Sequence, residues 1–75
     1  MAISKQDIIR IEAYMNTTFG TSSISLRERP KAEESAEVLL NGEFIGVIYK
    51  DEEDGETSYD FNMAILSEDL PKMAG

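Results

Sequence analysis

One stretch decides the fold of this chain: Glu37-Val38-Leu39-Leu40-Asn41-Gly42-Glu43-Phe44-Ile45-Gly46-Val47-Ile48-Tyr49. Two runs rich in apolar and β-branched residues flank the pair Asn41-Gly42. A two-residue type I′ turn needs positive φ at both central positions, which Asn tolerates and Gly adopts freely. The stretch therefore predicts a β-hairpin that turns at Asn41 and Gly42.

The turn fixes a register for the two strands of this hairpin. The expected pairs are Leu40 with Glu43, Leu39 with Phe44, Val38 with Ile45, Glu37 with Gly46 and Ala36 with Val47. Because paired residues share a face of the sheet, one face should carry Ala36, Val38, Leu40, Ile45, Val47 and Tyr49, and the other Glu37, Leu39, Phe44, Gly46 and Ile48. A sheet with one solvated face should alternate apolar with polar residues. The second face is instead half apolar, which indicates a contact surface.

The residues before the hairpin predict one amphipathic helix over about 4–19. Ser4 and Asp7 have the spacing of a capping box, and Gly20 suits the position after a helix. Ile8, Ile11, Met15 and Phe19 recur at helical spacing and should form one apolar stripe. This stripe is expected to cover the sheet face that bears Val38, Ile45, Val47, Tyr59 and Phe61.

The alternation of residues predicts four strands, at about 24–29, 35–41, 43–50 and 56–66, and a tail over 67–75. An acidic turn, 51–56, should join the last two strands and set Lys50 opposite Glu56. The fold class is therefore α+β, with one N-terminal helix on a four-stranded antiparallel meander in a single domain, 1–75. Two alternatives remain open, because the first strand could lie at the far edge and the tail could form a second short helix.

Composition excludes several classes of function. The chain has no cysteine and no histidine, which excludes thiolate chemistry, zinc fingers and His-based acid–base catalysis. Residues 1–31 hold five basic and three acidic side chains, whereas residues 32–75 hold two basic and twelve acidic ones. No apolar run approaches the roughly 20 residues of a membrane span, and the N-terminus has no signal-peptide pattern. We expect a cytoplasmic protein without membrane association, whose overall negative charge disfavours a nucleic-acid partner.

The chain also resembles a known family. The resemblance is carried by 29–31, 35–38, 42–49, 51–56, 58–59 and 63–66, among them Gly42-Glu43-Phe44-Ile45-Gly46-Val47-Ile48-Tyr49 and Met63-Ala64-Ile65-Leu66. It is similar to a small family of uncharacterised bacterial, alphaproteobacterial proteins known only as a domain of unknown function. The resemblance implies a bacterial cytoplasmic origin. It implies no activity and no functional residues.

Two charged clusters are candidate sites, and each has a simpler structural interpretation. The acidic turn offers Asp51, Glu53 and Asp54 as weak candidates for a divalent cation, although its spacing does not match an EF-hand loop. Arg27, Arg29 and Lys31 form a small basic cluster, which would suit RNA only beside stacked aromatics. The simpler interpretations are a solvated hairpin tip and a charged edge strand.

The half-apolar face is the main candidate for function. Its residues Leu39, Phe44, Gly46 and Ile48 predict an interaction surface, at which Gly46 would allow close approach by a partner. The leading hypothesis is a protein-interaction module with no enzymatic activity and no cofactor, acting as a homodimer or with an unknown protein partner. The alternatives are a small RNA-binding regulatory protein and a divalent-cation binder. The tail could instead fold back and cover the surface with Leu70 and Met73.

Overall fold

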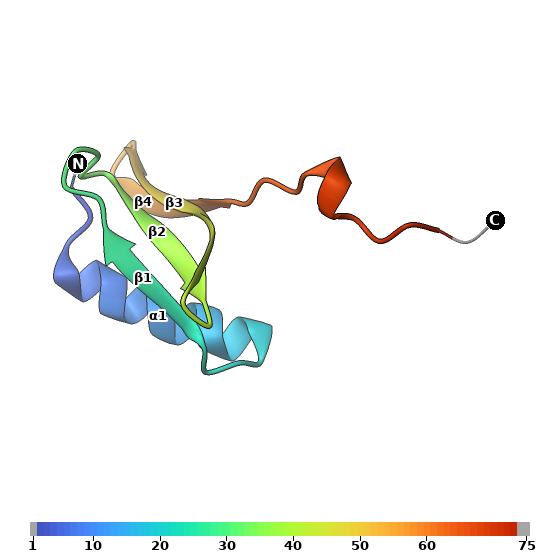
Figure 1. The fold of residues 1–75 in the computed structure, drawn as a ribbon. Helices are drawn as coiled ribbons and strands as arrows, with labels where there is room; N and C mark the ends of the chain where they lie inside the picture. The colour runs from blue at the N-terminus through green and yellow to red at the C-terminus, as the bar shows by residue number, and fades with distance from the viewer. Residues whose placement is uncertain (1, 74–75) are drawn as a thin grey trace.

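The computed structural model describes residues 2–73 and confirms the α+β architecture. Helix α1 (Lys5–Phe19) is followed by strands β1 (Ile24–Glu28), β2 (Ser35–Leu40), β3 (Glu43–Glu53) and β4 (Glu56–Asn62), and then by a short 3₁₀ turn, η1 (Ser67–Asp69). The strands form one antiparallel sheet in the order β1-β2-β3-β4. Figure 1 shows α1 lying across one side of this sheet, with the tail after β4 extending away from it. No helix in this part of the chain has the length and apolarity needed to cross a membrane.

Helix α1 begins and ends where its sequence predicts. The Asp7 N–H donates to Ser4 Oγ at 3.0 Å, and the Ser4 N–H donates to Asp7 Oδ2 at 2.9 Å, which completes the capping box. Gly20 ends the helix in the left-handed conformation with φ 65°. Ile11 and Met15 are buried and Ile8 packs beside the core, but Phe19, expected on the same stripe, is 57% exposed.

The β2–β3 hairpin has the expected turn and a different register beyond it. Leu40 pairs with Glu43 and Leu39 with Phe44 as predicted, but Val38 then pairs with Gly46. Ile45 is the extra residue of a β-bulge, which shifts every later pair by one position. The predicted pairs of Val38, Glu37 and Ala36 are therefore wrong, and the shift exchanges the faces of β3.

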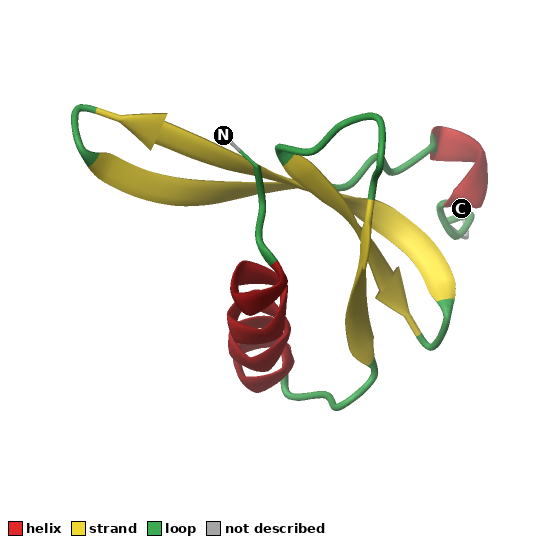
Figure 2. Cartoon of the chain, turned by 90° about the vertical axis from the view of Figure 1, so that its left-hand side faces the viewer, coloured by secondary structure: helices red, strands yellow, loops and turns green. Residues whose placement is uncertain are grey.

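The β3–β4 hairpin also turns more tightly than predicted. Asp54 and Gly55 adopt φ 52° and 79° and make a two-residue turn, so β3 continues to Glu53. Glu53 rather than Lys50 faces Glu56, and Lys50 faces Tyr59. The tip of this hairpin projects beyond the helix (Figure 2).

The hydrophobic core lies between α1 and the middle of the sheet. Its buried members are Ile3, Ile11, Met15, Ile24, Leu26, Ala36, Val38 and Ile48. Tyr59 and Phe61 pack against this cluster as predicted for the helix-covered face, as does Ile45. Val47, expected beside them, pairs instead with Glu37 on the other face.

The two edges of the sheet differ in how they are covered. At β1, the Ile24 N–H donates to Asn16 Oδ1 at 2.9 Å, and Asn16 Nδ2 donates to the Ile24 carbonyl at 3.0 Å. The Leu26 N–H donates to Glu12 Oε2 at 2.8 Å. Side chains of α1 thus form hydrogen bonds with backbone groups at the β1 edge. These hydrogen bonds protect the edge from pairing with another strand. No strand of the described chain pairs with the outer side of β4.

Candidate functional site

The predicted interaction surface is not assembled as one exposed patch. Ile48 is only 4% exposed and belongs to the core, because the bulge at Ile45 turns it towards α1. Gly46 is buried as well. Leu39 is half-buried and paired with Phe44, which is 57% exposed, on the face away from α1. The prediction that these four residues share an open face is therefore wrong.

Gly46 has a different role from the one its sequence suggested. A Cβ atom at this position would lie 2.4 Å from the Asn62 carbonyl oxygen and 2.7 Å from Cε1 of Phe61. Strand β4 of the same chain, and not a partner, takes up the space that the missing side chain leaves. The absent side chain lets the Phe61 ring lie directly over β3.

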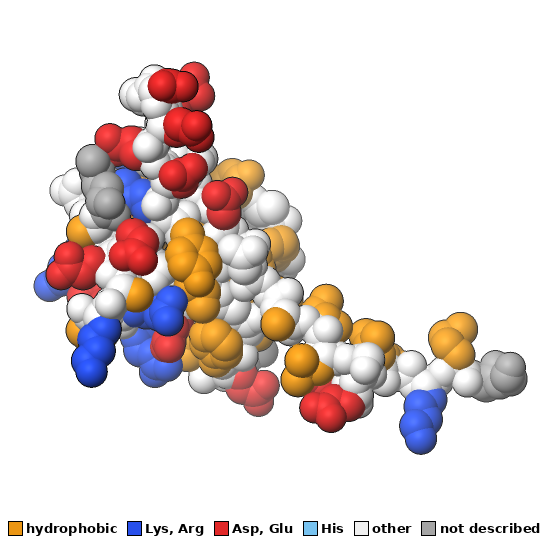
Figure 3. Space-filling view, turned by 90° about the horizontal axis from the view of Figure 1, so that it is seen from above, with side chains coloured by type: hydrophobic (Ala, Val, Ile, Leu, Met, Phe, Trp, Pro, Cys, Tyr) orange, Lys and Arg blue, Asp and Glu red, His pale blue; other side chains and the backbone are white. Residues whose placement is uncertain are grey.

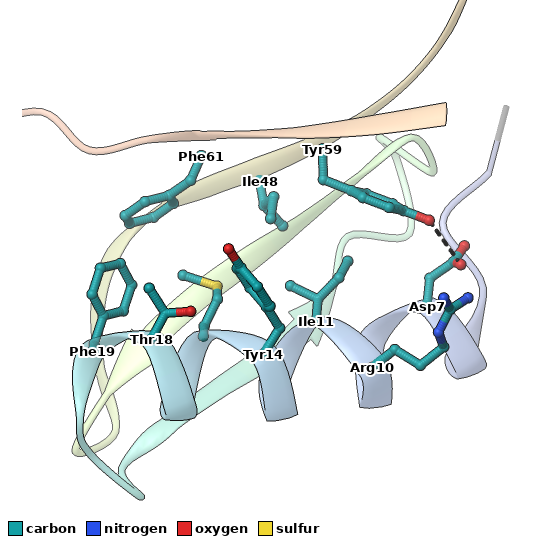
Figure 4. Close-up of a pocket in the computed structure, with 10 residues that line it drawn as sticks. Asp7, Arg10, Ile11, Tyr14, Thr18, Phe19, Ile48, Tyr59 and Phe61 are labelled. Atoms are coloured by element: carbon teal, nitrogen blue, oxygen red, sulfur yellow. Dashed lines mark hydrogen bonds between the residues drawn. The ribbon is translucent and has the colours of Figure 1, made fainter. Parts of the chain in front are cut away.

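The structure offers a second candidate, a groove between α1 and β4. It is partly open to solvent and has a volume of about 460 Å³. Its walls are formed by Asp7, Arg10, Ile11, Tyr14, Met15, Thr18, Phe19, Ile48, Tyr59 and Phe61. Figure 4 shows Phe19 and Phe61 facing each other at one end and Asp7 with Arg10 at the other. The groove exists because α1 packs mainly against β1 and leaves the inner face of β4 incompletely covered.

The middle of the groove is apolar and has aromatic walls. Tyr14 and Phe19 on α1 are 70% and 57% exposed, while Tyr59 and Phe61 on β4 are half-buried. Large aromatic side chains stabilise an interface strongly, because a partner that covers them removes a large apolar area from water. A single exposed apolar residue needs no explanation, but two at the rim of one apolar groove make this groove the main candidate site.

A charged cluster closes one end of the groove. Lys50 Nζ donates to Asp7 Oδ2 at 2.8 Å, and the Tyr59 hydroxyl donates to Asp7 Oδ1 at 3.0 Å. The Lys50 ammonium and the Ser4 N–H hold the pKa of Asp7 well below its usual range. The hydrogen bond to Asp7 raises the pKa of Lys50, and burial followed by that hydrogen bond raises the pKa of Tyr59. All three groups therefore keep their ordinary charge at neutral pH.

The charged candidates from the sequence lie outside the groove. Asp51 and Glu53 are on the projecting end of β3 and Asp54 is in the turn beyond it, where Figure 3 shows acidic side chains gathered at the tip. Within residues 2–73, no three acidic side chains lie close enough together to hold a metal ion.

Two arginines of the basic cluster contact neighbouring side chains of the same chain. Arg27 pairs with Glu37 across β1 and β2, with Nε 2.7 Å from Oε1. Arg29 donates to Ser35 Oγ at 3.1 Å. These contacts fit the simpler interpretation of a charged edge strand.

The tail does not cover either face of the sheet. Leu70 and Met73, expected to fold back, are 53% and 91% exposed. The tail leaves β4 and runs away from the body, with hydrophobic side chains along it (Figures 1 and 3). Residues 74 and 75 of the predicted tail lie outside the described part of the chain.

Comparison with known proteins agrees with the resemblance noted in the sequence. A family model described as Protein of unknown function (DUF3126) matches residues 7–69. The chain belongs to this family. The match covers α1 from Asp7 onwards, the whole sheet and η1, and so includes both walls of the groove. A search of curated proteins and a search of solved structures found no match.

Proposed function

We propose that this member of the DUF3126 family is a non-enzymatic protein-interaction module, and that it binds an apolar polypeptide segment in the groove between α1 and β4. The observation that supports this function is the pair of exposed aromatic rings, Tyr14 and Phe19, at the rim of an apolar groove. Binding sites for short segments are typically apolar clefts with a few polar groups that fix orientation. Arg10, at one end of the groove, supplies such a polar group.

The state of the ionisable groups supports binding rather than catalysis. Asp7 accepts from Ser4, Lys50 and Tyr59, and its lowered pKa makes it a poor proton acceptor. Lys50 and Tyr59 have raised pKa values and hold their protons at neutral pH. General acid–base chemistry requires a pKa near the working pH. The pKa values of these three groups are shifted away from neutral pH, which suits a structural ion-pair network.

Two neighbouring threonines provide a matched test. Thr18 lines the groove, whereas Thr17 is exposed on α1 outside it. The full-length chain would be used to select binders from a displayed library of short random peptides, and the selected peptides would be titrated against the wild type, Thr18→Glu and Thr17→Glu. We expect apolar peptides whose affinity falls at least tenfold in Thr18→Glu and stays within twofold in Thr17→Glu.

The position of the bound peptide would be read from amide chemical shifts of the full-length chain. We expect the largest changes at Ile11, Met15 and Phe61, in the groove. Peptides that bind both threonine variants equally, or that shift Leu39 and Tyr49 on the opposite face, would contradict the proposed site.

A further inference from the structure

The described tail is itself an apolar segment with no apolar partner. Its five large hydrophobic side chains, at Met63, Ile65, Leu66, Leu70 and Met73, are between half and nine-tenths exposed. Such a density of exposed apolar residues on one extended segment is typical of a segment that is buried in an assembly. The described part of the chain thus has both an open apolar groove and an exposed apolar tail.

We propose that the occupant of the groove is the tail, residues 63–73, of a second copy of this chain. This inference rests on the proposed function and names its ligand. Each of two copies would place its tail in the groove of the other, which gives a closed twofold dimer. The tail would lie along β4, the sheet edge to which no strand of the described chain is paired.

The dimensions of the tail fit the groove. Along α1 the groove extends from Phe19 to Asp7, which is about 18 Å at the helical rise per residue. The segment from Met63 to Asp69 spans about 12 Å if it is entirely 3₁₀ and about 20 Å if it is fully extended. The segment combines an extended part with the turn η1, so its length falls between these limits.

The charges of the two surfaces are complementary. Arg10 lies at one end of the groove and takes part in neither ion pair recorded within residues 2–73. Glu68 and Asp69 follow the first apolar residues of the tail. If Ile65 and Leu66 lie between Phe19 and Phe61, the two carboxylates reach the Arg10 end. The opposite charges would therefore fix the direction of the bound tail.

The direction of β4 favours a second copy over the chain's own tail. Tyr59 lies at the Asp7 end of the groove and Phe61 at the Phe19 end, so β4 leaves the groove at the aromatic end (Figure 4). To return along its own groove, the chain would have to reverse within 63–66. Reversals are built most often from Gly, Pro, Asn, Asp or Ser. Asn62 is paired with Val47 in the sheet, and Met63-Ala64-Ile65-Leu66 contains none of these residues.

A mixed-label experiment separates the two arrangements. The chain has no cysteine, so Lys72→Cys gives a single attachment point for a nitroxide at the end of the tail. Spin-labelled chain without ¹⁵N would be mixed with ¹⁵N-labelled wild type. Because the bound tail runs from the Phe19 end towards Arg10, we expect the strongest broadening at the amide signals of Arg10 and Ile11 in the ¹⁵N-labelled wild-type copy. We also expect the solution mass to approach twice 8.4 kDa with rising concentration.

Tail variants test the apolar contact without threatening the fold, because these side chains are exposed in the single chain. Ile65→Asp with Leu66→Asp should raise the dimer dissociation constant at least tenfold. Ser67→Asp adds a charge beside them without removing an apolar group and should change it less than threefold.

Three results would overturn the inference. The first is broadening in a separate sample of ¹⁵N-labelled, spin-labelled chain without broadening in the mixed sample, which would place the tail in its own groove. The second is a dimer without broadening in the groove, which would place the interface elsewhere. The third is a monomer without broadening at every concentration. In each case, the peptide titration with Thr18→Glu decides independently whether the groove binds apolar segments.

Discussion

The Tyr59 hydroxyl donates to Oδ1 of Asp7 at 3.0 Å and thereby joins the first turn of α1 to β4. The other carboxylate oxygen of Asp7 accepts from Lys50 on β3 at 2.8 Å. One carboxylate, which also completes the helix cap, therefore holds the helix against two strands. Because the two walls of the groove are α1 and β4, this contact also sets their separation at the charged end.

The central position of Asp7 predicts a loss of stability on neutralisation. Asp7→Asn keeps the size of the side chain but removes the charge that Lys50 and the Ser4 N–H bind. We expect the free energy of unfolding to fall by about 2 kcal/mol, measured by urea denaturation at neutral pH. Asp60→Asn removes an equivalent charge from an exposed strand position. This control should change the free energy of unfolding by less than about 0.5 kcal/mol. Equal effects of the two substitutions would contradict this role of Asp7.

The lowered pKa of Asp7 predicts an acid dependence with a defined sign. The unfolded chain binds a proton at Asp7 near the ordinary pKa of 3.8, whereas the folded chain resists protonation to lower pH. The stability contributed by the carboxylate is therefore fully present above this value and is lost as pH falls below it. We expect the difference in unfolding free energy between wild type and Asp7→Asn to shrink below about pH 4. A difference that stayed constant down to pH 2 would contradict the mechanism.

Gly46 predicts a steric defect at the base of the groove. In Gly46→Ala the new Cβ would meet the Asn62 carbonyl oxygen at 2.4 Å, so β4 must move outward. We expect a loss of about 1–3 kcal/mol in the free energy of unfolding, together with shifted ring resonances of Phe61. Adding Phe61→Leu removes only the side-chain clash, because the Asn62 contact is backbone. The double variant should therefore recover little stability, and full recovery would show that the ring alone sets the constraint.

The fold could be predicted largely from local signals, and the groove could not. The capping box at Ser4 and Asp7 and the turn at Asn41 and Gly42 are contained within a few residues, so the sequence indicates them directly. The groove depends instead on contacts such as Asp7 with Tyr59, whose residues are far apart in the chain. Such contacts follow from strand register, and one shifted position reassigns every later side chain to the other face.

Two signals in the sequence could have corrected the register. A glycine inside a strand, here Gly46, often marks a bulge or a close backbone approach, and the bulge lies directly before it. Asp54-Gly55 is a typical two-residue hairpin turn, but the surrounding acidic residues favoured a longer loop. Nothing in the neighbouring sequence predicts that Phe19 and the tail are exposed. The spacing of apolar residues predicts a helix or a strand, but it does not show which apolar side chains remain in contact with solvent.

The hydrogen bonds of Asn16 predict a weakened edge when its side chain is removed. Asn16→Ala leaves both the N–H and the carbonyl of Ile24 without their helix partner. We expect a loss of about 2 kcal/mol in the free energy of unfolding, with faster amide hydrogen exchange at Ile24. Thr17→Ala, at the next and exposed helix position, is the matched control. An unchanged exchange rate at Ile24 would show that the Asn16 side chain does not protect the backbone of β1.

The tip of the β3–β4 hairpin predicts a stabilising substitution. Glu53 and Glu56 pair directly across the two strands, and like charges in opposed positions destabilise a sheet. Glu56→Lys replaces this repulsion by attraction, so we expect the free energy of unfolding to rise by about 0.2–1 kcal/mol at low salt. Added salt should reduce the gain, because both side chains are exposed and screened. Glu33→Lys makes the same change in net charge at an exposed position between β1 and β2, outside any strand pair. A gain of equal size in Glu33→Lys would assign the effect to net charge instead of the cross-strand pair.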